Sequence, residues 1–483
     1  MNAPNHDAIA VSLHEALELQ RAAFLSAPSP SAQQRRDDLR QLARMLSDHR
    51  QTLVEAIAQD YGSRSSFETL FAEFLVVIQT IHHARRHVAR WMKPQRRPID
   101  WLLYPGAGNR LIPQPVGVVG VIVPWNFPLN LSMCPLASIF AAGNRAMVKM
   151  SENSRHLAAL LRRISASYFP PDKLCFIADT GETGPLFSAL PFDHLLFTGS
   201  GATGRAVMAN AARNLTPVTL ELGGKSPAIV GPDYPVRTAA ERILWAKMFN
   251  AGQICTSVDY VFLPESAVDE FVAHCRQLVA KRYPDLGSED YTAIIDERSF
   301  ARLQHMLQDA RDKGATVLAL AANSGAPESA ARRKFPPHLV LRPSEDMLLS
   351  QREIFGPILP IRTYRSREEV AAYINAHDRP LALYPFTHDR AMQDYYITHV
   401  MSGGVAINDT ILHVAQDDLP FGGSGASGMG HYHGHEGFLT FSKLRPVFRQ
   451  GRFSSVQAFF MPPYGGRKWQ LLKLLLRLKG QSR

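Results

Sequence analysis

The first hundred residues carry apolar side chains at helical spacing. Between positions 39 and 57, leucine, alanine, valine and isoleucine recur every three or four residues, and a phenylalanine-rich series from 67 to 78 repeats the pattern. This period predicts amphipathic helices. Pro94 and Pro98 end the pattern. The segments Ile99 to Tyr104 and Arg110 to Gln114, on either side of a glycine-containing turn, then predict a projecting β-hairpin.

Beyond residue 115, short apolar runs alternate with helical patterns, which is typical of a doubly wound parallel sheet. The first series predicts strands over Val116 to Val123, Ala146 to Lys149, Leu174 to Ala178 and His194 to Thr198, and helices over Pro128 to Ala142, Ser154 to Tyr168 and Gly181 to Ala189. A second series predicts strands over Pro227 to Val230 and Tyr260 to Leu263, and helices over Ala239 to Phe249 and Ala267 to Arg282. We therefore expect an α/β protein with two such sheets.

Composition narrows the class of protein without naming a function. A chain of 483 residues, 46% hydrophobic and 20% charged, is long enough for two or three packed domains. Its four cysteines show no CxxC spacing, which argues against a disulfide framework and a structural zinc site. No stretch approaches the roughly 18 apolar residues of a spanning helix, and no signal-peptide pattern begins the chain. We expect a cytoplasmic location.

The net charge of +10 is concentrated at the C-terminus. Residues 443 to 483 contain ten lysines and arginines and no acidic residue, so the remainder is balanced. The body lacks a basic stripe with interleaved aromatics, and nucleic-acid binding is not expected. Between Lys468 and Lys479, leucines alternate with basic residues and predict a short basic amphipathic helix. Two roles stay open for it: docking over the substrate entrance or a partner subunit, or peripheral attachment to anionic lipid.

A glycine-rich segment from Phe197 to Gly204 follows a predicted strand and opens a helical pattern. Its backbone amides and the helix N-terminus suit a phosphate group. Gly199, Gly201 and Gly204 satisfy GxGxxG, and Glu221 lies near the distance expected for a ribose-binding acid. The motif follows the fourth predicted strand of its sheet rather than the first. At this point an ordinary strand-to-helix turn remains an alternative.

A set of short segments in one order is far more specific than any of its members. The segments are Pro124-Trp-Asn-Phe-Pro128, Lys149-Met-Ser-Glu152, Phe197-Thr-Gly-Ser200, Leu220-Glu-Leu-Gly-Gly-Lys225, Gly252-Gln-Ile-Cys255, Glu353-Ile-Phe-Gly-Pro357 and Pro420-Phe-Gly-Gly-Ser-Gly425. Together they resemble the aldehyde dehydrogenase superfamily over nearly the whole chain. The run Gly428-Met-Gly-His-Tyr-His-Gly434 and the short N-terminus resemble its usually dimeric class 3 branch, which implies a homodimer.

The resemblance implies the aldehyde dehydrogenase fold, with two doubly wound parallel-sheet domains and a small β oligomerisation domain. We expect the cofactor-binding domain over residues 1–94 and 117–222, and the catalytic domain over 223–403. The oligomerisation domain then covers 95–116 and 404–450, and a basic amphipathic tail covers 451–483.

The same resemblance assigns three catalytic residues. Cys255 is expected to add to the aldehyde carbonyl and become a thioester after hydride loss. Asn126 is expected to stabilise the oxyanion with the Cys255 backbone N–H. Glu221, between Leu220 and Leu222, is expected to act as the general base that activates water, which replaces the ribose role considered above. Outside the family motif, a lone cysteine is more often a buried structural residue.

Cofactor contacts follow from the motifs in the same way. Lys149 and Glu152 match positions that contact the adenosine ribose, although Met150 stands where the family usually has proline. Thr198 and Gly199 are expected to line the nicotinamide and Ser200 the pyrophosphate. Glu353 and Phe355 are expected to hold the nicotinamide ribose and ring. A carboxylate at position 152 favours NAD because it repels a 2′-phosphate, while NADP stays open as an alternative.

The Val-Lys-Met-Ser-Glu segment at 148–152 and the Pro-Pro-Tyr-Gly segment at 462–465 resemble bacterial members of this branch that act on coniferyl aldehyde. The resemblance therefore implies NAD(P)-dependent oxidation of an aromatic, coniferyl-type aldehyde to the carboxylic acid. A long-chain fatty aldehyde is the alternative substrate. Glu221 argues against a CoA-acylating enzyme, and the presence of both Cys255 and Glu221 argues against a catalytically silent binding protein. His431, His433 and His435 alternate as metal ligands can, but thiolate and oxyanion donors need no Lewis acid, and no metal is expected.

Overall fold

The computed structural model describes residues 6–179, 181–321, 332–452, 459 and 461–480. Its N-terminal part is helical, as the apolar spacing predicts. The elements are α1 (His6–Ser26), α2 (Ala32–Asp48), α3 (Arg50–Tyr61), α4 (Ser66–Thr69), the π-helical segment η1 (Leu70–Leu75) and α5 (Val76–Trp91). Ser31 begins α2 with a capping box, since its hydroxyl accepts from the Gln34 N–H and the Gln34 side chain accepts from the Ser31 N–H.

A six-stranded sheet follows, in the order β15-β7-β6-β3-β4-β5. Its strands are β3 (Val118–Ile122), β4 (Arg145–Lys149), β5 (Leu174–Ile177), β6 (His194–Gly199), β7 (Val218–Leu222) and the antiparallel β15 (Gly428–Met429), with helices α6 (Asn130–Ala142), α7 (Arg155–Ser165), α8 (Thr183–Ser188) and α9 (Gly201–Ala212). The strands after β3 lie on both sides of it, which makes β3 the switch point of the sheet. In such sheets ligands bind at the carboxyl ends of the strands next to the switch point.

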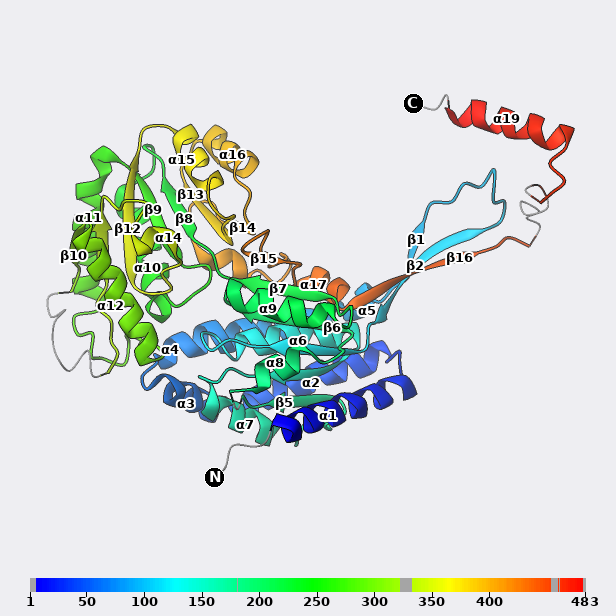
Figure 1. The fold of residues 1–483 in the computed structure, drawn as a ribbon, viewed down its shortest axis with the longest axis horizontal. Helices are drawn as coiled ribbons and strands as arrows, with labels where there is room; N and C mark the ends of the chain where they lie inside the picture. The colour runs from blue at the N-terminus through cyan, green and yellow to red at the C-terminus, as the bar shows by residue number, and fades with distance from the viewer. Residues whose placement is uncertain (1–5, 180, 322–331, 453–458, 460, 481–483) are drawn as a thin grey trace.

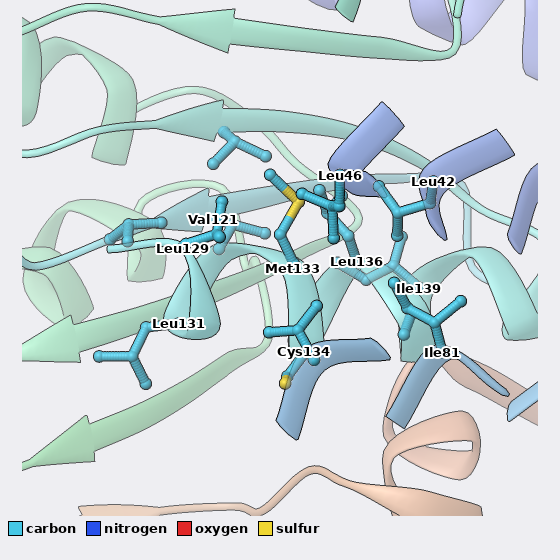
Figure 2. Close-up of a cluster of buried hydrophobic side chains, with 14 of the residues drawn as sticks. Leu42, Leu46, Ile81, Val121, Leu129, Leu131, Met133, Cys134, Leu136 and Ile139 are labelled. Atoms are coloured by element: carbon cyan, nitrogen blue, oxygen red, sulfur yellow. The ribbon is translucent and has the colours of Figure 1, made fainter. Parts of the chain in front are cut away.

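Helix α6 is buried from its second residue to its end. Every residue from Leu131 to Ala142 is buried, because the helix lies between the six-stranded sheet and helices α2 and α5. Figure 2 shows this core, in which Leu42 and Leu46 of α2, Ile81 of α5 and Val121 of β3 surround Met133, Leu136 and Ile139 of α6. Full burial of such a side chain stabilises by about 1.5–3 kcal/mol. The segment 124–129 between β3 and α6 is thereby anchored at both ends.

A second sheet has seven strands in the order β10-β11-β12-β9-β8-β13-β14, parallel except for β10. Its strands are β8 (Ser226–Val230), β9 (Val258–Pro264), β10 (Thr316–Ala319), β11 (His338–Leu341), β12 (Ile358–Tyr364), β13 (Ala382–Phe386) and β14 (Gly404–Val405). Its helices are α10 (Val236–Met248), α11 (Val268–Arg282), α12 (Glu297–Asp312), α14 (Leu348–Gln351), α15 (Arg367–Asn375) and α16 (Arg390–His399). Helix α17 (Gly434–Thr440) packs against α6. The predicted α/β class is confirmed, whereas the domain limits stay a prediction.

Three antiparallel strands, β1 (Gln95–Arg97), β2 (Gly108–Pro115) and β16 (Ser442–Arg449), extend away from the rest of the molecule as an arm (Figure 1). The projecting hairpin is confirmed, but its first strand was predicted wrongly. Ile99 to Tyr104 forms turns, and residues 95–97 pair with β2 instead. Pro98 has no N–H to continue the ladder. Beyond it, the Asp100 carboxylate accepts the Leu103 N–H and turns the chain.

The predicted basic helix is present as α19 (Gly466–Gly480) at the far end of the arm (Figure 1). Its Trp469, Leu474 and Leu476 side chains are more than half exposed, and Lys479 forms an ion pair with Asp100. Residues 453–458, 460 and 481–483 of the predicted tail lie outside the described residues. No helix in the described ranges is long and apolar enough to cross a membrane.

Candidate active site

The predicted catalytic residues meet between the two large sheets. Asn126 follows β3, Glu221 lies in β7, and Cys255 lies between α10 and β9. Asn126 and Cys255 line one cavity. The carboxylates of Glu221 and Glu353 are close enough to Cys255 to raise the pKa of its thiol. The structure therefore gathers residues that are up to 227 positions apart in the sequence.

A strained turn places the thiol of Cys255. Asn250, Ala251 and Gly252 have φ values of 50°, 50° and 74°, which is the left-handed region. Glycine is required at position 252 for two reasons: its φ is positive, and a Cβ there would overlap the backbone of Gly356. Non-glycine residues in this conformation cost of order 1–3 kcal/mol each and persist where the surroundings impose them. Such strain beside Cys255 is typical of a functional loop.

The side chain of Asn126 faces this turn. Asn126 is buried, and its Nδ2 donates to the Gln253 backbone carbonyl at 3.2 Å. Because an amide nitrogen carries two N–H groups, one donor remains for another acceptor. That donor belongs to a residue that lines the same cavity as Cys255. The arrangement suits the predicted oxyanion role.

Glu221 is buried in an apolar environment and is 2% exposed. Burial raises the pKa of its carboxyl well above the usual 4.5, because the charged form loses its hydration. Within the described part of the chain, neither carboxyl oxygen has a hydrogen-bond partner. An unpaired carboxyl group with a raised pKa near a thiol is what a general base at neutral pH requires.

Burial opposes ionisation of the Cys255 thiol. Burial raises its pKa to about 12, and the carboxylates of Glu353 and Glu221 add to the effect. A thiolate is the nucleophilic form. Its formation therefore needs a proton acceptor or a positive charge close to the sulfur.

Strands β4 and β6, on either side of β3, bring predicted cofactor residues to one edge of the sheet. Lys149 ends β4, and Thr198 and Gly199 end β6. Glu152, three residues after Lys149, is exposed. Lys149 forms a buried ion pair with Asp179, which follows β5 and was not predicted. A polar residue directly after a parallel strand was the available signal for Asp179.

These residues fit a dinucleotide. Ser200 caps α9, a helix of 12 residues whose first amides follow directly on the end of β6 and suit an anion. A Cβ on Gly204 would overlap Leu222, so glycine lets α9 pack closely on β7. Thr198 Oγ1 is buried and, among the described residues, has no hydrogen-bond partner. An orphaned buried hydroxyl at this edge is consistent with a ligand that completes the site.

Glu353 and Phe355 approach the site from the other sheet. The Glu353 carboxylate occupies the space left by the missing side chain of Gly223, and burial raises its pKa to about 8. Phe355 has a φ of 46°, and its ring meets that of Trp125 edge-on at 5.5 Å. The Glu-Ile-Phe segment therefore contacts both the Asn126 loop and the end of β7.

The cavity beside Cys255 is mainly apolar and aromatic. Its lining includes Phe71, Phe127, Leu131, Trp245, Phe249, Ile254, Ile411, Val414, Phe421 and Tyr432, with His433, Asn130 and Thr256 among the polar residues. Phe249 packs on Phe71, Phe127 and Trp245 with ring centroids 5.5–6.3 Å apart. This lining was not predicted from the sequence, because it comes from four separate regions of the chain.

Comparisons with known proteins identify the family. The model of the aldehyde dehydrogenase family matches residues 3–447. The chain belongs to the aldehyde dehydrogenase family and catalyses NAD(P)-dependent oxidation of an aldehyde. The predicted resemblance, fold and reaction are thereby confirmed.

Three relatives are similar to the chain over nearly its whole length. A probable coniferyl aldehyde dehydrogenase of Pseudomonas aeruginosa is 50% identical over 95% of both chains. The coniferyl aldehyde dehydrogenase of Pseudomonas sp. strain HR199 is 44% identical over 97% of both. Human aldehyde dehydrogenase family 3 member B1 is 35% identical over 97% of this chain and 98% of its own, which agrees with the class 3 resemblance.

Two solved structures share the fold. Staphylococcus aureus AldH in a substrate-bound state has a TM-score of 0.89 at 32% identity, covering 96% of this chain and 99% of its own. Betaine aldehyde dehydrogenase from Staphylococcus aureus in complex with NAD+ has a TM-score of 0.81 at 25% identity, covering 91% and 88%.

Proposed function

We propose that the protein oxidises an aromatic aldehyde of the coniferyl type to its acid through a thioester on Cys255. The main observation in support of this proposal is that Cys255 and Asn126 line one aromatic-rich cavity, with the buried Glu221 carboxyl near Cys255. A planar aromatic substrate gains edge and face contacts from such a lining. Relatives at 50% and 44% identity bear the coniferyl name, which supports the same substrate class.

In the proposed reaction the Cys255 thiol gives its proton to solvent water as its sulfur bonds to the aldehyde carbon. The negative oxygen accepts hydrogen bonds from Asn126 Nδ2 and the Cys255 backbone N–H. NAD(P), when bound, supplies the acceptor for the hydride that leaves the carbon. Glu221 then takes a proton from water as its oxygen adds to the thioester. The carbon–sulfur bond breaks, the acid leaves, and the proton held by Glu221 returns to the sulfur, which regenerates the Cys255 thiol and the Glu221 carboxylate.

For the cofactor we propose NAD in preference to NADP. Glu152 is exposed three residues after the end of β4, where its carboxylate would meet the adenosine ribose. A carboxylate hydrogen-bonds a ribose 2′-hydroxyl and repels a 2′-phosphate. Lys149 and Asp179 would hold the same end of the cofactor from the neighbouring strands.

We further propose a cytoplasmic homodimer. Among the described residues, which include all four cysteines, each cysteine is a free thiol, as a reducing compartment favours. The arm and α19 expose apolar side chains away from the body, which supports a subunit contact there. Attachment of α19 to anionic lipid is the alternative use of the same leucines and basic residues.

A panel of aldehydes tests the substrate proposal. NADH formation would be measured with cinnamyl, coniferyl, benzyl and long aliphatic aldehydes, each with and without CoA. We expect the highest kcat/KM for the cinnamyl-type compounds and no effect of CoA. A preference for long aliphatic aldehydes would replace the aromatic assignment, and a requirement for CoA would make the enzyme CoA-acylating.

A further inference from the structure

A buried ion pair lies directly behind the Asn126 loop. Arg64 follows α3 and Glu73 lies in the π-helical segment, and Arg64 Nη1 is 3.0 Å from Glu73 Oε1 with both side chains fully buried. The second oxygen of Glu73 accepts the backbone N–H groups of Leu129 at 2.7 Å and Asn130 at 3.2 Å. Burying two charges is costly unless their geometry is well satisfied. Glu73 thus accepts at the start of α6, whereas Arg64 Nε and Nη2 have no hydrogen-bond partner among the described residues, so Nη1 makes the polar contacts of the cation.

Arg64 also holds the backbone of Asn126. The same Nη1 donates to the Asn126 carbonyl oxygen at 2.9 Å, and the guanidinium lies over the rings of Tyr61 and Phe127 at 4.8 and 5.0 Å. That carbonyl oxygen accepts two further hydrogen bonds, from Tyr61 Oη at 3.0 Å and Asn250 Nδ2 at 3.2 Å. Three donors, one of them cationic, fix the orientation of a single peptide group.

The same short segment reaches the turn that carries Cys255. The Glu68 carboxylate accepts the Asn250 backbone N–H at 3.1 and 3.2 Å and the Thr292 hydroxyl at 2.6 Å. Asn250 is the first residue of the left-handed turn. Residues 64 to 73 therefore hold both the peptide of the oxyanion donor and the turn of the nucleophile.

We propose that Arg64, held by Glu73, is a positioning residue for oxyanion stabilisation: it fixes the Asn126 peptide so that the amide donor and the Cys255 N–H converge on one point. The inference rests on the proposed role of Asn126. Oxyanion donors act within a narrow range of about 2.7–3.1 Å. A displacement of about 1 Å in a positioned group can cost about 10²-fold in rate.

A double-mutant cycle tests this assignment. Arg64→Met combined with Glu73→Gln removes the cation without leaving a buried carboxylate alone, and the new amide oxygen can still accept from Leu129 and Asn130. We expect kcat for cinnamaldehyde to fall about 10- to 100-fold with KM within about twofold. In an Asn126→Ala background the same pair of changes should alter kcat by less than about twofold, because the positioned donor is already absent.

Two further measurements separate positioning from general damage. Iodoacetamide alkylates the Cys255 sulfur by displacement at a saturated carbon and needs no oxyanion donor, so its rate should stay within about twofold. Arg35 supplies a matched control: it is a second buried arginine, and its Nη1 donates to Ala141 and Ala142 at the opposite end of α6. Arg35→Met should lower Tm and leave kcat within about twofold.

Three results would overturn the proposal. The first is an additive loss of kcat in the double-mutant cycle. The others are an equal fall in the alkylation rate and in turnover, or a matching loss of kcat in Arg35→Met. If the paired variant does not fold, Arg64→Lys carries the test, since it keeps the charge but loses the planar guanidinium that lies over Tyr61 and Phe127. An unchanged kcat in Arg64→Lys would equally overturn the assignment. Should Asn126→Ala itself leave turnover unchanged, the proposed role of Asn126 fails, and this result is distinguishable from failure of the Arg64 inference.

Discussion

The side-chain amide of Asn126 donates a 3.2 Å hydrogen bond to the backbone carbonyl of Gln253, two residues before Cys255. The bond joins the end of β3 to the turn between α10 and β9, and so connects the two large sheets at the reacting thiol. Its energetic value is modest, about 0.5–1.5 kcal/mol. Its geometric effect is larger, because it directs the second N–H of the amide.

Asn126→Ala should lower the rate of NADH formation by about 10²–10³-fold, the usual loss for one oxyanion donor. Affinity for NAD should change little, since the amide is not among the proposed cofactor contacts. Pre-steady-state NADH formation gives the rate. Asn130→Ala is the matched control, because Asn130 lines the same cavity but donates to the Ala72 carbonyl. Equal losses in both variants would contradict a specific role for Asn126.

Glu221→Gln should allow the first NADH to form and then slow thioester hydrolysis. A rapid burst close to one equivalent per site, followed by a slow steady state, is the expected trace in stopped-flow fluorescence. If the burst disappears along with turnover, Glu221 acts before hydride transfer.

The pH profile gives a second test of Glu221. Burial raises its pKa above 4.5, and the base form is the carboxylate, so steady-state turnover should rise as the pH increases through that raised pKa. The rise should be absent from the residual turnover of Glu221→Gln. A profile identical in the two enzymes would assign the ionisation to another group.

Glu152→Gln should increase the use of NADP relative to NAD, because removal of the carboxylate removes its repulsion of the 2′-phosphate. The ratio of kcat/KM for the two cofactors measures the change. Glu182→Gln serves as a control, since Glu182 is also exposed but precedes α8 rather than following β4. An unchanged ratio in Glu152→Gln would place the preference elsewhere.

Ending the chain after Gly465 removes α19 and separates its two proposed uses. If the helix binds lipid, the full-length enzyme should sediment with anionic liposomes at low salt more than at high salt, and the truncated form should not. If it docks on a subunit near the substrate entrance, truncation should instead change KM for bulky aldehydes, with equal lipid binding by both forms. Sedimentation and kinetics on the same two proteins decide between them.

Regular elements and motif positions could be predicted from the sequence, because they depend on local periodicity and on residues that are close in the chain. Helix α6 and strands β3 to β6, β8 and β9 follow from apolar runs, whereas β7 and β10 to β15 were not predicted. The glycine at 252 and the segment order located the Cys255 turn. The first strand of the arm was missed, since it is short and polar and is defined by pairing with β2.

The burial of residues 64 to 73 could not be predicted in the same way. Phe67, Leu70, Phe71 and Leu75 give the helical period, yet they are 38–76% exposed in the described structure, whereas Glu68 and Glu73 are buried. Their partners are Asn250, Thr292 and the start of α6, which are distant in sequence. The one available signal was the presence of two glutamates within a helical apolar pattern. Charged residues in such a pattern ordinarily lie on a solvated face.

The most direct test of the thioester account is NADH formation by Cys255→Ala with coniferyl aldehyde, measured beside NAD binding to the same protein. We predict turnover at background level with NAD affinity within about twofold of the unchanged enzyme, because the sulfur forms the reacting bond but contributes little to holding the dinucleotide. Cys175→Ala, at a partly buried cysteine in β5, should keep full activity. Substantial turnover by Cys255→Ala would contradict the account.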